Sequence, residues 1–480
     1  MLSRTDPATI DGKHFDVVVI GSGFGSAFFV RKLLQRKRQR ILIVEWGDHH
    51  PHDWQIENNR NSAIRDDETY VSTSDKPWNY TIALGGGANC WFAQTPRFHP
   101  TDFKLQSLYG AGVDWPIDYD DLDPYYGEAE AIMSVSGDPD MTRVLPRSTP
   151  FPQPPHRLSS VDRVMKTARP DQHFAMPTAR ARVATESRPA CCASFRCQLC
   201  PVDAKFTANN GLMDVFSNPA VTLCLKTRAV RFESDASAVQ RLVVEHAGRE
   251  RKVSGDLFVL GANAIQSPAL LLRSDMGGGR TGLGLHESYG VHVEAFLDGL
   301  DNFDGSTITT GLNYGLYDGA FRKDHAAALV YFDNRWTHGL RPEPGRWRQT
   351  LPLMLVTEDL PSDANRVAID GQGQAKVIYT SASTYARDGM DKALARLPDL
   401  LAPLPVEKIV FRRARPTESH LQGTLRMGAD PKTSVIDQNQ IHHRWRNLVV
   451  VGSSTFASCS CANPSLTVAA LSLRAASQLA

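Results

Sequence analysis

A short apolar segment runs directly into a glycine-rich turn near the start of the chain, and this junction constrains the fold more than any other feature. Residues 15–20 (FDVVVI) are rich in β-branched side chains, and residues 21–27 (GSGFGSA) follow at once. Gly21 permits a tight turn, Gly23 lets a pyrophosphate approach the backbone, and Ser26 stands where a third glycine usually lets helix and strand touch. The pattern predicts a strand, a turn and a helix whose N-terminus binds a dinucleotide.

A second apolar run and an acidic residue extend this unit. Ala27, Val30 and Leu34 would share one face of the helix, and residues 41–44 (ILIV) form the next predicted strand. Glu45 ends that strand, where a carboxylate can accept hydrogen bonds from ribose hydroxyls. The alternative is an ordinary βαβ unit that binds no nucleotide.

Length and charge narrow the possible functions. The 480 residues are enough for two domains, or for a nucleotide domain with a second domain inserted into it. Lys plus Arg (53) nearly balances Asp plus Glu (52), which gives no sign of a nucleic-acid or acidic partner. No apolar run reaches 18 residues, and the first fourteen residues are too polar for a signal peptide. We therefore expect a cytoplasmic protein without a membrane segment, unless a partner's signal exports it.

Half of the eight cysteines fall within ten residues, at Cys191, Cys192, Cys197 and Cys200. Thiolates are soft ligands that select zinc or iron–sulfur centres, and adjacent cysteines suit a cluster better than a single zinc ion. The alternative is a loop of buried or disulfide-linked cysteines. Another possible metal site, residues 49–52 with three histidines, lacks further ligands at useful spacing, and we expect a solvated loop there.

Five further segments carry a resemblance to a known family. They are residues 84–98 (LGGGANCWFAQTPRF), 257–264 (LFVLGANA), 420–428 (HLQGTLRMG), 447–454 (NLVVVGSS) and 463–467 (NPSLT). In this order they resemble the glucose-methanol-choline (GMC) oxidoreductases, in which a Gly-Gly loop lies along the isoalloxazine of FAD. The resemblance covers about half of the chain.

The resemblance implies an α/β fold with a discontinuous, Rossmann-like FAD-binding domain and an α+β substrate domain built on an antiparallel sheet. We place the FAD domain at 1–130, 185–285 and 415–480, and the substrate domain at 131–184 and 286–414. Residues 328–331, 353–356 and 367–369 are expected strands of that antiparallel sheet, and residues 385–397 a helix that stops before Pro398. The expected FAD contacts are Gly21, Ser22, Gly23, Gly25, Ser26, Glu45, Gly85, Gly86, Asn89, Cys90, Val230, Gly261, Ala262, Gly452, Ser453, Asn463 and Pro464.

Catalysis is expected at His420 and Asn463. A neutral imidazole at His420 can take the proton of an alcohol while a hydride leaves the same carbon for flavin N5. The Asn463 amide can hold the substrate oxygen. Their alternative roles are a satisfied polar histidine and an Asn-Pro turn. At Cys90, where some relatives carry a histidine bonded to the flavin, we favour a packed free thiol over a thioether bond.

Within the family, the sequence is most similar to bacterial FAD-dependent sugar dehydrogenases and to pyranose oxidases. In such dehydrogenases an Arg-Pro pair, Arg188 and Pro189 here, precedes a Cys-Cys-x4-Cys motif that binds an iron–sulfur cluster (3Fe-4S or 4Fe-4S). Cys200 lies one residue closer than that pattern expects. The prediction is therefore oxidation of a sugar, glycoside or polyol, with electrons passed to a quinone, cytochrome or dye and a small or cytochrome subunit as a possible partner. A pyranose-oxidase-like enzyme that uses O2, and a lyase of the same fold, are the alternatives.

Overall fold

The predicted strand, turn and helix form the starting unit of the fold. In the computed structural model, which describes residues 2, 4–35, 39–334 and 346–479, β1 (His14–Ile20) leads into α1 (Phe24–Leu34) and then β2 (Ile41–Val44). The two strands are parallel, with Val17 opposite Ile41. Their buried aliphatic side chains pack with α1 into the main hydrophobic core, as the apolar runs predicted.

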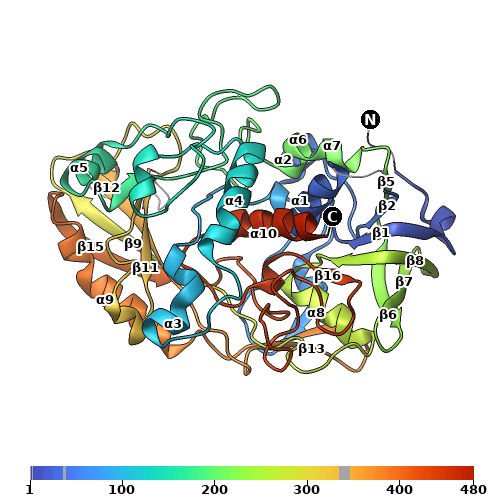
Figure 1. Cartoon of the computed structure of the whole chain (residues 1–480). Coiled ribbons are helices and arrows are strands. Elements are labelled where there is room, and N and C mark those ends of the chain that lie inside the picture. The colour runs from blue at the N-terminus through green and yellow to red at the C-terminus, as the bar shows by residue number, and fades with distance from the viewer. Residues whose placement is uncertain (1, 3, 36–38, 335–345, 480) are drawn as a thin grey trace.

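A seven-stranded sheet continues from these strands (Figure 1). Four adjacent strands of this sheet are parallel to one another, and two antiparallel strands follow them. A seventh strand pairs in parallel with the end of β8. Helices α1, α8 (Asn263–Arg273) and α10 (Ser465–Gln478) pack beside the sheet. The strands in order are β5 (Val221–Cys224), β2, β1, β8 (Arg249–Leu260), β7 (Val239–His246) and β6 (Arg228–Ser234), with β16 (Leu448–Val450) beside β8.

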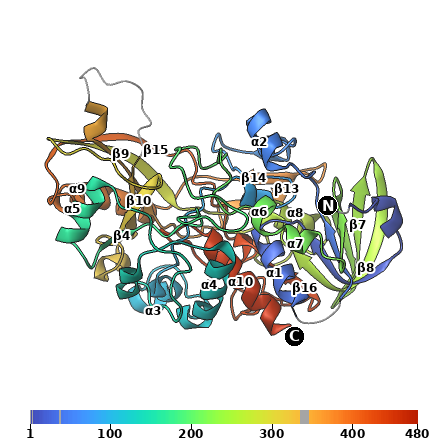
Figure 2. The same cartoon turned by 90° about the horizontal axis from the view of Figure 1, so that it is seen from above.

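A six-stranded antiparallel sheet lies at the opposite end of the molecule, and α10 lies between the two sheets in both views (Figures 1 and 2). Helix α9 (Thr384–Leu400) covers its outer face and contacts β9, β11 and β12. The strands in order are β15 (Val406–Ala414), β9 (Tyr289–Leu297), β12 (Thr350–Thr357), β11 (Ala328–Asp333), β10 (Thr309–Asn313) and β4 (His173–Ala175).

The prediction that this helix stops before Pro398 was wrong. Helix α9 includes Pro398 and ends at Leu400. Pro398 is exposed, so the carbonyl group that loses its partner to the proline can face water, while Leu397 and Leu400 on the buried side pack against the sheet. Burial of these two leucines favours continuation of the helix.

A third sheet joins segments that the sequence placed in different domains. β13 (Arg366–Ile369) and β14 (Ala375–Ile378) form a hairpin, and β14 pairs in parallel with β3 (Tyr70–Ser72). The prediction that residues 367–369 belong to the large antiparallel sheet was therefore wrong. Val367 and Val377 instead pack with Tyr70 and Trp78 in a separate cluster. The domain boundaries stay a prediction.

The remaining helices connect the sheets. They are α2 (His52–Asn58), α3 (Leu105–Tyr109), α4 (Tyr119–Met133), α5 (Ser160–Ala168), α6 (Ala208–Gly211) and α7 (Met213–Phe216). The expected fold class, an α/β protein with a Rossmann-like parallel sheet and an antiparallel second sheet, is confirmed. Within the described ranges, no helix is both long and apolar enough to cross a membrane.

Candidate active site

The first of two adjoining cavities follows the β1–α1 turn. Gly21 adopts a positive φ of 86°, and a Cβ there would lie 2.6 Å from the carbonyl oxygen of Gly261. Gly25 lets α1 approach the last strand, because a Cβ there would lie 2.7 Å from the amide nitrogen of Gly452. Gly23, at the start of α1, has open space where its side chain would be. This is the space that a phosphate at a helix N-terminus requires.

Glu45 is held at the edge of this cavity by its neighbours. Its carboxylate accepts hydrogen bonds from the Ser22 hydroxyl (2.7 Å), the Ser22 amide (3.2 Å) and the Gly47 amide (2.8 Å). Burial raises the pKa of Glu45. The predicted acceptor of ribose hydroxyls is therefore present and fixed in orientation.

Most of the predicted cofactor residues line this cavity, Cys90 and Asn463 line the second cavity, and the others lie behind the wall of the first. Ser26 lies against Gly261, and Asn89 braces its own loop by donating to the Leu84 carbonyl (2.8 Å). Val230 lies just beyond residues 227–229, which form part of the wall. Gly85, with a positive φ of 85°, shapes the loop before the cavity wall. The predicted residues that line the cavity are Gly21, Ser22, Gly23, Gly25, Glu45, Gly86, Gly261, Ala262, Gly452, Ser453 and Pro464.

Sequence reasoning missed an aromatic contact in this wall. The Arg228 guanidinium lies over the Trp46 ring, 4.5 Å from its centre, and both residues line the cavity near Glu45. Flat, polarisable surfaces of this kind suit a nucleobase. Trp46 directly follows Glu45 in the sequence, and that adjacency was the available signal.

His420 and Asn463 meet where the first cavity joins the second. Asn463 Nδ2 lies 3.4 Å from His420 Nε2, and His420 lines both cavities. His420 Nδ1 lies 3.4 Å from the Ser288 hydroxyl, and the His420 amide donates to a Glu287 carboxylate oxygen at 3.1 Å. Burial, with Arg415 nearby, lowers the pKa of His420 to about 3. The imidazole is therefore neutral at physiological pH and able to accept a proton.

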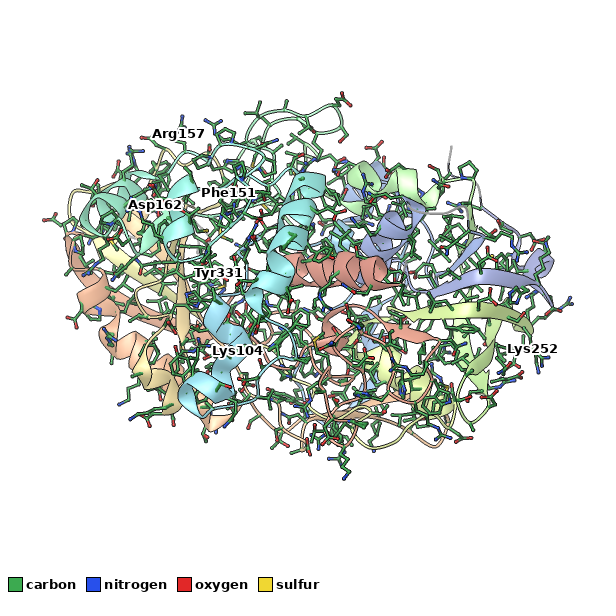
Figure 3. The ribbon with its side chains drawn as sticks, viewed as in Figure 1. Lys104, Phe151, Arg157, Asp162, Lys252 and Tyr331 are labelled. Atoms are coloured by element: carbon green, nitrogen blue, oxygen red, sulfur yellow. The ribbon has the colours of Figure 1, made fainter. Side chains whose placement is uncertain are left out.

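The opposite end of the Asn463 amide has a partner that the sequence did not suggest. The Tyr331 hydroxyl lies 3.1 Å from Asn463 Oδ1 and 3.1 Å from the carbonyl oxygen of Cys461. Tyr331 belongs to β11, and Figure 3 labels it at the inner side of the antiparallel sheet. Nothing in the pattern around residue 331 indicates a contact with residue 463, because the two lie on different parts of the fold.

The second cavity encloses about 830 Å³, a volume typical of small-molecule sites. Cys90 and Asn463 line it. The Cys90 sulfur lies 3.0 Å from the Thr81 hydroxyl, and burial raises the pKa of its thiol. The possible bond from Cys90 to the flavin stays a prediction.

The predicted substrate domain contains other aromatic and polar side chains that a substrate could contact. Trp336 and His338 fall outside the described residues. Tyr379 packs edge-on against Trp78, and Arg387 is on α9; neither of the two lines a cavity.

The four clustered cysteines are not gathered into a ligand set. Cys197 and Cys200 are buried, Cys191 is partly buried and Cys192 is exposed. Over the described ranges, no three His, Cys, Asp or Glu side chains lie close enough together to hold a metal ion, and all eight cysteines are free. The loop offers thiol donors of the right chemistry, but its present arrangement is not that of a formed cluster site.

The solvated loop expected at residues 49–52 was a wrong prediction. His50 is buried, stacks on Trp54 with 3.8 Å between ring centres, and accepts a hydrogen bond from the Ala63 amide. The His52 ring lies 2.7 Å from the Cys200 carbonyl oxygen. Contacts with Trp54 and Ala63 bury His50, and the contact with the cysteine loop leaves His52 only partly exposed.

Comparison with known proteins shows which family this chain resembles. A family model described as GMC oxidoreductase matches residues 368–472, a range that includes both His420 and Asn463. The chain belongs to the GMC oxidoreductase family. This GMC oxidoreductase is 26% identical to the fructose dehydrogenase large subunit of Gluconobacter japonicus, over 96% of this chain and 97% of that protein.

Two further similarities cover nearly the whole chain. The GMC oxidoreductase is 28% identical to the 6'''-hydroxyparomomycin C oxidase of Streptomyces lividus, over 99% of this chain and 93% of that protein. Its fold is similar to that of pyridoxine 4-oxidase from Mesorbium loti, with a TM-score of 0.68 and 18% identity over 96% of this chain and 98% of that one.

FAD fits the first cavity of this GMC oxidoreductase. The open space beside Gly23 and Gly87, the start of α1 and the fixed Glu45 carboxylate together suit a dinucleotide with its pyrophosphate at the turn. The enzyme is a GMC-type, FAD-dependent oxidoreductase that acts on alcohol groups and passes electrons to an acceptor. Bound FAD supplies the acceptor of the hydride.

Proposed function

We propose that this enzyme oxidises a secondary or anomeric hydroxyl of a sugar, glycoside or related polyol. The observation that carries the proposal is the pair formed by His420 and Asn463, 3.4 Å apart at the junction of the nucleotide cavity and the second cavity. A hydroxyl-bearing carbon at this junction would face both a base and the cofactor. The established activity of the family on alcohols agrees with this placement.

Each residue of the pair has a distinct task. His420 Nε2, unprotonated because its pKa is lowered to about 3, takes the proton of the substrate hydroxyl. Asn463 Nδ2 donates a hydrogen bond to the same oxygen and stabilises the negative charge that develops there. The Ser288 hydroxyl can accept a hydrogen bond from Nδ1, which leaves Nε2 free as the base.

The lining of the second cavity disfavours a cationic substrate. Amines are cations at neutral pH, and a cavity with more arginines than carboxylates repels them. Burial raises the pKa of Glu418 to about 8, so this carboxyl group is largely uncharged at neutral pH and adds little negative charge to the cavity. The charged residues of the lining are Arg60, Arg65, Arg413, Arg415, Asp66, Asp333 and Glu418.

For the electrons, we propose a route through an iron–sulfur cluster held by the cysteine loop, with Cys191, Cys192 and Cys197 as ligands and Cys200 as a fourth. The soft thiol donors and their short spacing support this route. A quinone, cytochrome or dye would be the final acceptor. The similarity to a protein named as a large subunit supports a further small or cytochrome subunit as a partner. Eight free cysteines support a cytoplasmic location.

An oxidase of the pyranose oxidase type is the second candidate. Two observations favour it: the cysteines are not gathered into a ligand set in the described part of the chain, and one relative is named an oxidase. In this case O2 would reoxidise the flavin and the cysteines would be structural.

Anaerobic stopped-flow mixing with a panel of sugars and polyols tests the proposed function. We expect flavin absorbance to bleach with at least one sugar, and His420→Ala to slow that bleaching by about 10²-fold or more. An unchanged single-turnover rate in the variant would remove His420 as the base. Iron and acid-labile sulfide counted on the same sample separate the cluster dehydrogenase from the oxidase.

A further inference from the structure

The floor of the second cavity carries an arginine beside the His420–Asn463 pair. Arg415 directly follows β15 and lines this cavity. Its Nη1 lies 2.8 Å from the sulfur of Met354 on β12, two strands away from β15. Met354 is opposite Tyr331, whose hydroxyl contacts Asn463, and residues opposite each other on antiparallel strands share a face. The Arg415 charge also adds to the effect of burial in lowering the pKa of His420.

A glycine on the strand between them makes this reach possible. The Arg415 amide donates to the carbonyl oxygen of Gly290 on β9 at 2.8 Å. A Cβ at Gly290 would overlap the carboxyl group of Glu418, which packs there and accepts a hydrogen bond from Arg415 Nη1 at 2.6 Å. Gly290 thus leaves room for Glu418, and Glu418 fixes the guanidinium group across the sheet.

Arg415 has hydrogen-bond donors that remain available to a ligand. Among the residues that the structure describes, only its Nη1 donates, to Glu418 and to the Met354 sulfur. A guanidinium group also has donors on Nε and Nη2. The Arg415 side chain is 26% exposed and lines the cavity, so these donors are accessible from it.

The positive charge of Arg415 is poorly balanced by neighbouring acids. Over the described ranges, Glu418 supplies the one carboxylate oxygen within 4 Å of it. Burial raises the pKa of Glu418 to about 8, so this group carries little negative charge at neutral pH. Glu287, another acid close to Glu418, is already paired with Lys76. An anion bound to Arg415 would therefore meet a positive field.

A second arginine makes the same side of the floor more positive. Arg413 of β15 is opposite His292 on β9, and both line the cavity. Asp333, the acid on the far side of the floor, belongs to β11 and accepts a hydrogen bond from the Thr309 hydroxyl at 2.6 Å. Three strand spacings separate β11 from β15, which is about 14 Å. The floor is therefore positive along β15 and acidic along β11.

The remaining charged side chains of the lining interact among residues 54–67 and form no ion pair with Arg415. They are Arg60, over the Trp54 ring, Arg65, paired with Asp67, and Asp66, which accepts a hydrogen bond from the Asp67 amide. The positive side of the cavity near the base is thus formed by Arg413 and Arg415.

We infer that Arg415 selects a sugar acid, an aldonate or a uronate, by binding its carboxylate group beside His420 and Asn463. The inference rests on the proposed oxidation of a sugar hydroxyl and names the class of sugar. A planar guanidinium group matches the two oxygens of a carboxylate and forms strong, charge-assisted hydrogen bonds with them. With the carboxylate held there, a hydroxyl-bearing carbon of the same molecule can lie at the His420–Asn463 pair.

Matched pairs of neutral and acidic sugars test this inference on the full-length, FAD-loaded enzyme. The pairs are D-glucose with D-glucuronate, D-glucose with D-gluconate, and D-galactose with D-galacturonate. Anaerobic stopped-flow mixing gives the half-saturating concentration for flavin reduction by each compound. Arg415→Met removes the charge, and Arg415→Lys keeps the charge but not the planar fork. Arg163→Met is the control, because Arg163 pairs with Asp304 at the surface and lines neither cavity.

We expect the wild type to prefer the acid in at least one pair, with a half-saturating concentration at least about tenfold lower than that of the neutral sugar. Arg415→Met should abolish this ratio, and Arg415→Lys should retain part of it. Arg163→Met should match the wild type. The ratio is compared because a general effect of a substitution on the flavin site changes both members of a pair alike.

Three results would contradict the inference or the function on which it rests. Flavin reduction by neutral sugars with no preference for any acid would overturn the inference while the proposed function stands, and so would a preference that survives in Arg415→Met. Reduction by none of the compounds would overturn the proposed function. In that case titration of the flavin absorbance with the same acids decides the inference: a shift lost in Arg415→Met supports it, and no shift, or one unchanged in this variant, overturns it.

Discussion

The Tyr331 hydroxyl lies 3.1 Å from Asn463 Oδ1, and this contact turns the amide nitrogen of Asn463 toward His420. Tyr331 thus acts through Asn463 as a positioning residue. Loss of its hydroxyl would free the amide to rotate and would weaken its hold on the substrate oxygen.

We predict that Tyr331→Phe slows anaerobic flavin reduction about tenfold, the effect of one lost hydrogen bond of about 1.4 kcal/mol. FAD content and melting temperature should change little. In an Asn463→Ala background the same substitution should have no further effect, because the group through which it acts is absent. Additive effects of the two substitutions would contradict the positioning role.

Tyr314→Phe is the matched control. The Tyr314 hydroxyl is also buried in the cluster around Tyr331, but it has no hydrogen-bond partner among the residues that the structure describes. Its removal should leave the rate of flavin reduction unchanged.

The rate of flavin reduction at acidic pH should reflect the low pKa of His420. An imidazole with a pKa of about 3 stays neutral where an ordinary histidine would be protonated. We predict no inflection near pH 6.5 in the rate of flavin reduction between about pH 5 and 8. A loss of rate centred near pH 6.5 would show an imidazole that titrates normally.

The same pKa shift has a consequence for stability. The unfolded chain binds a proton at His420 below about pH 6.5, whereas the folded chain does not until about pH 3. The contribution of this group to the free energy of unfolding therefore falls as pH is lowered through that window. Denaturant unfolding should show the wild type losing stability relative to His420→Gln between pH 7 and 5, by about 1 kcal/mol per pH unit below 6.5. A difference that is independent of pH would contradict this.

The open space beside Gly23 predicts an effect on FAD without an effect on folding. Gly23→Ala introduces a methyl group that would lie more than 4 Å from every described residue other than its chain neighbours, so the apoprotein should keep its melting temperature. The methyl group would occupy the approach of the pyrophosphate, and the FAD dissociation constant should rise about tenfold or more. Gly371→Ala is the control, because that position is also open but lies away from both cavities. Equal FAD affinity in both variants would place the pyrophosphate elsewhere.

Glu287 organises the segment that carries the base. It pairs with Lys76 and accepts hydrogen bonds from the Thr417 hydroxyl and from the amides of Glu418 and His420. We predict that Glu287→Ala lowers the free energy of unfolding by about 3–5 kcal/mol, because three hydrogen bonds to a buried carboxylate and its ion pair with the partly buried Lys76 are lost together. Urea unfolding measures this loss. Glu233→Ala, at a surface ion pair with Lys252, should cost no more than about 1 kcal/mol; similar losses in both variants would contradict the role of Glu287.

Features with a dense local pattern could be predicted from the sequence. The β1–turn–α1 unit, Glu45 and the strand segment at 41–44 follow from short-range periodicity and from glycine positions that a tight turn requires. The segments that contain His420 and Asn463 were similarly distinctive. The structure brings these two residues together, although 42 positions separate them in the sequence.

Contacts between distant residues could not be predicted. Tyr331, Ser288 and Glu287 reach the site from two strands or strand ends, and β-strands of similar composition reveal neither their partner nor the direction of one side chain. Tertiary packing also decided the helix around Pro398 and the pairing of residues 366–369. In both places burial of apolar side chains outweighed the local signal.

The parallel pairing of β14 with β3 affects how the molecule can open. Those backbone hydrogen bonds tie residues 375–377 to residues 70–72, and the β13–β14 hairpin also packs on α8 beside the parallel sheet. The hairpin should therefore stay with the parallel sheet if the antiparallel sheet moves. Such a motion would have to bend the connection between β12, which ends at Thr357, and β13, which begins at Arg366.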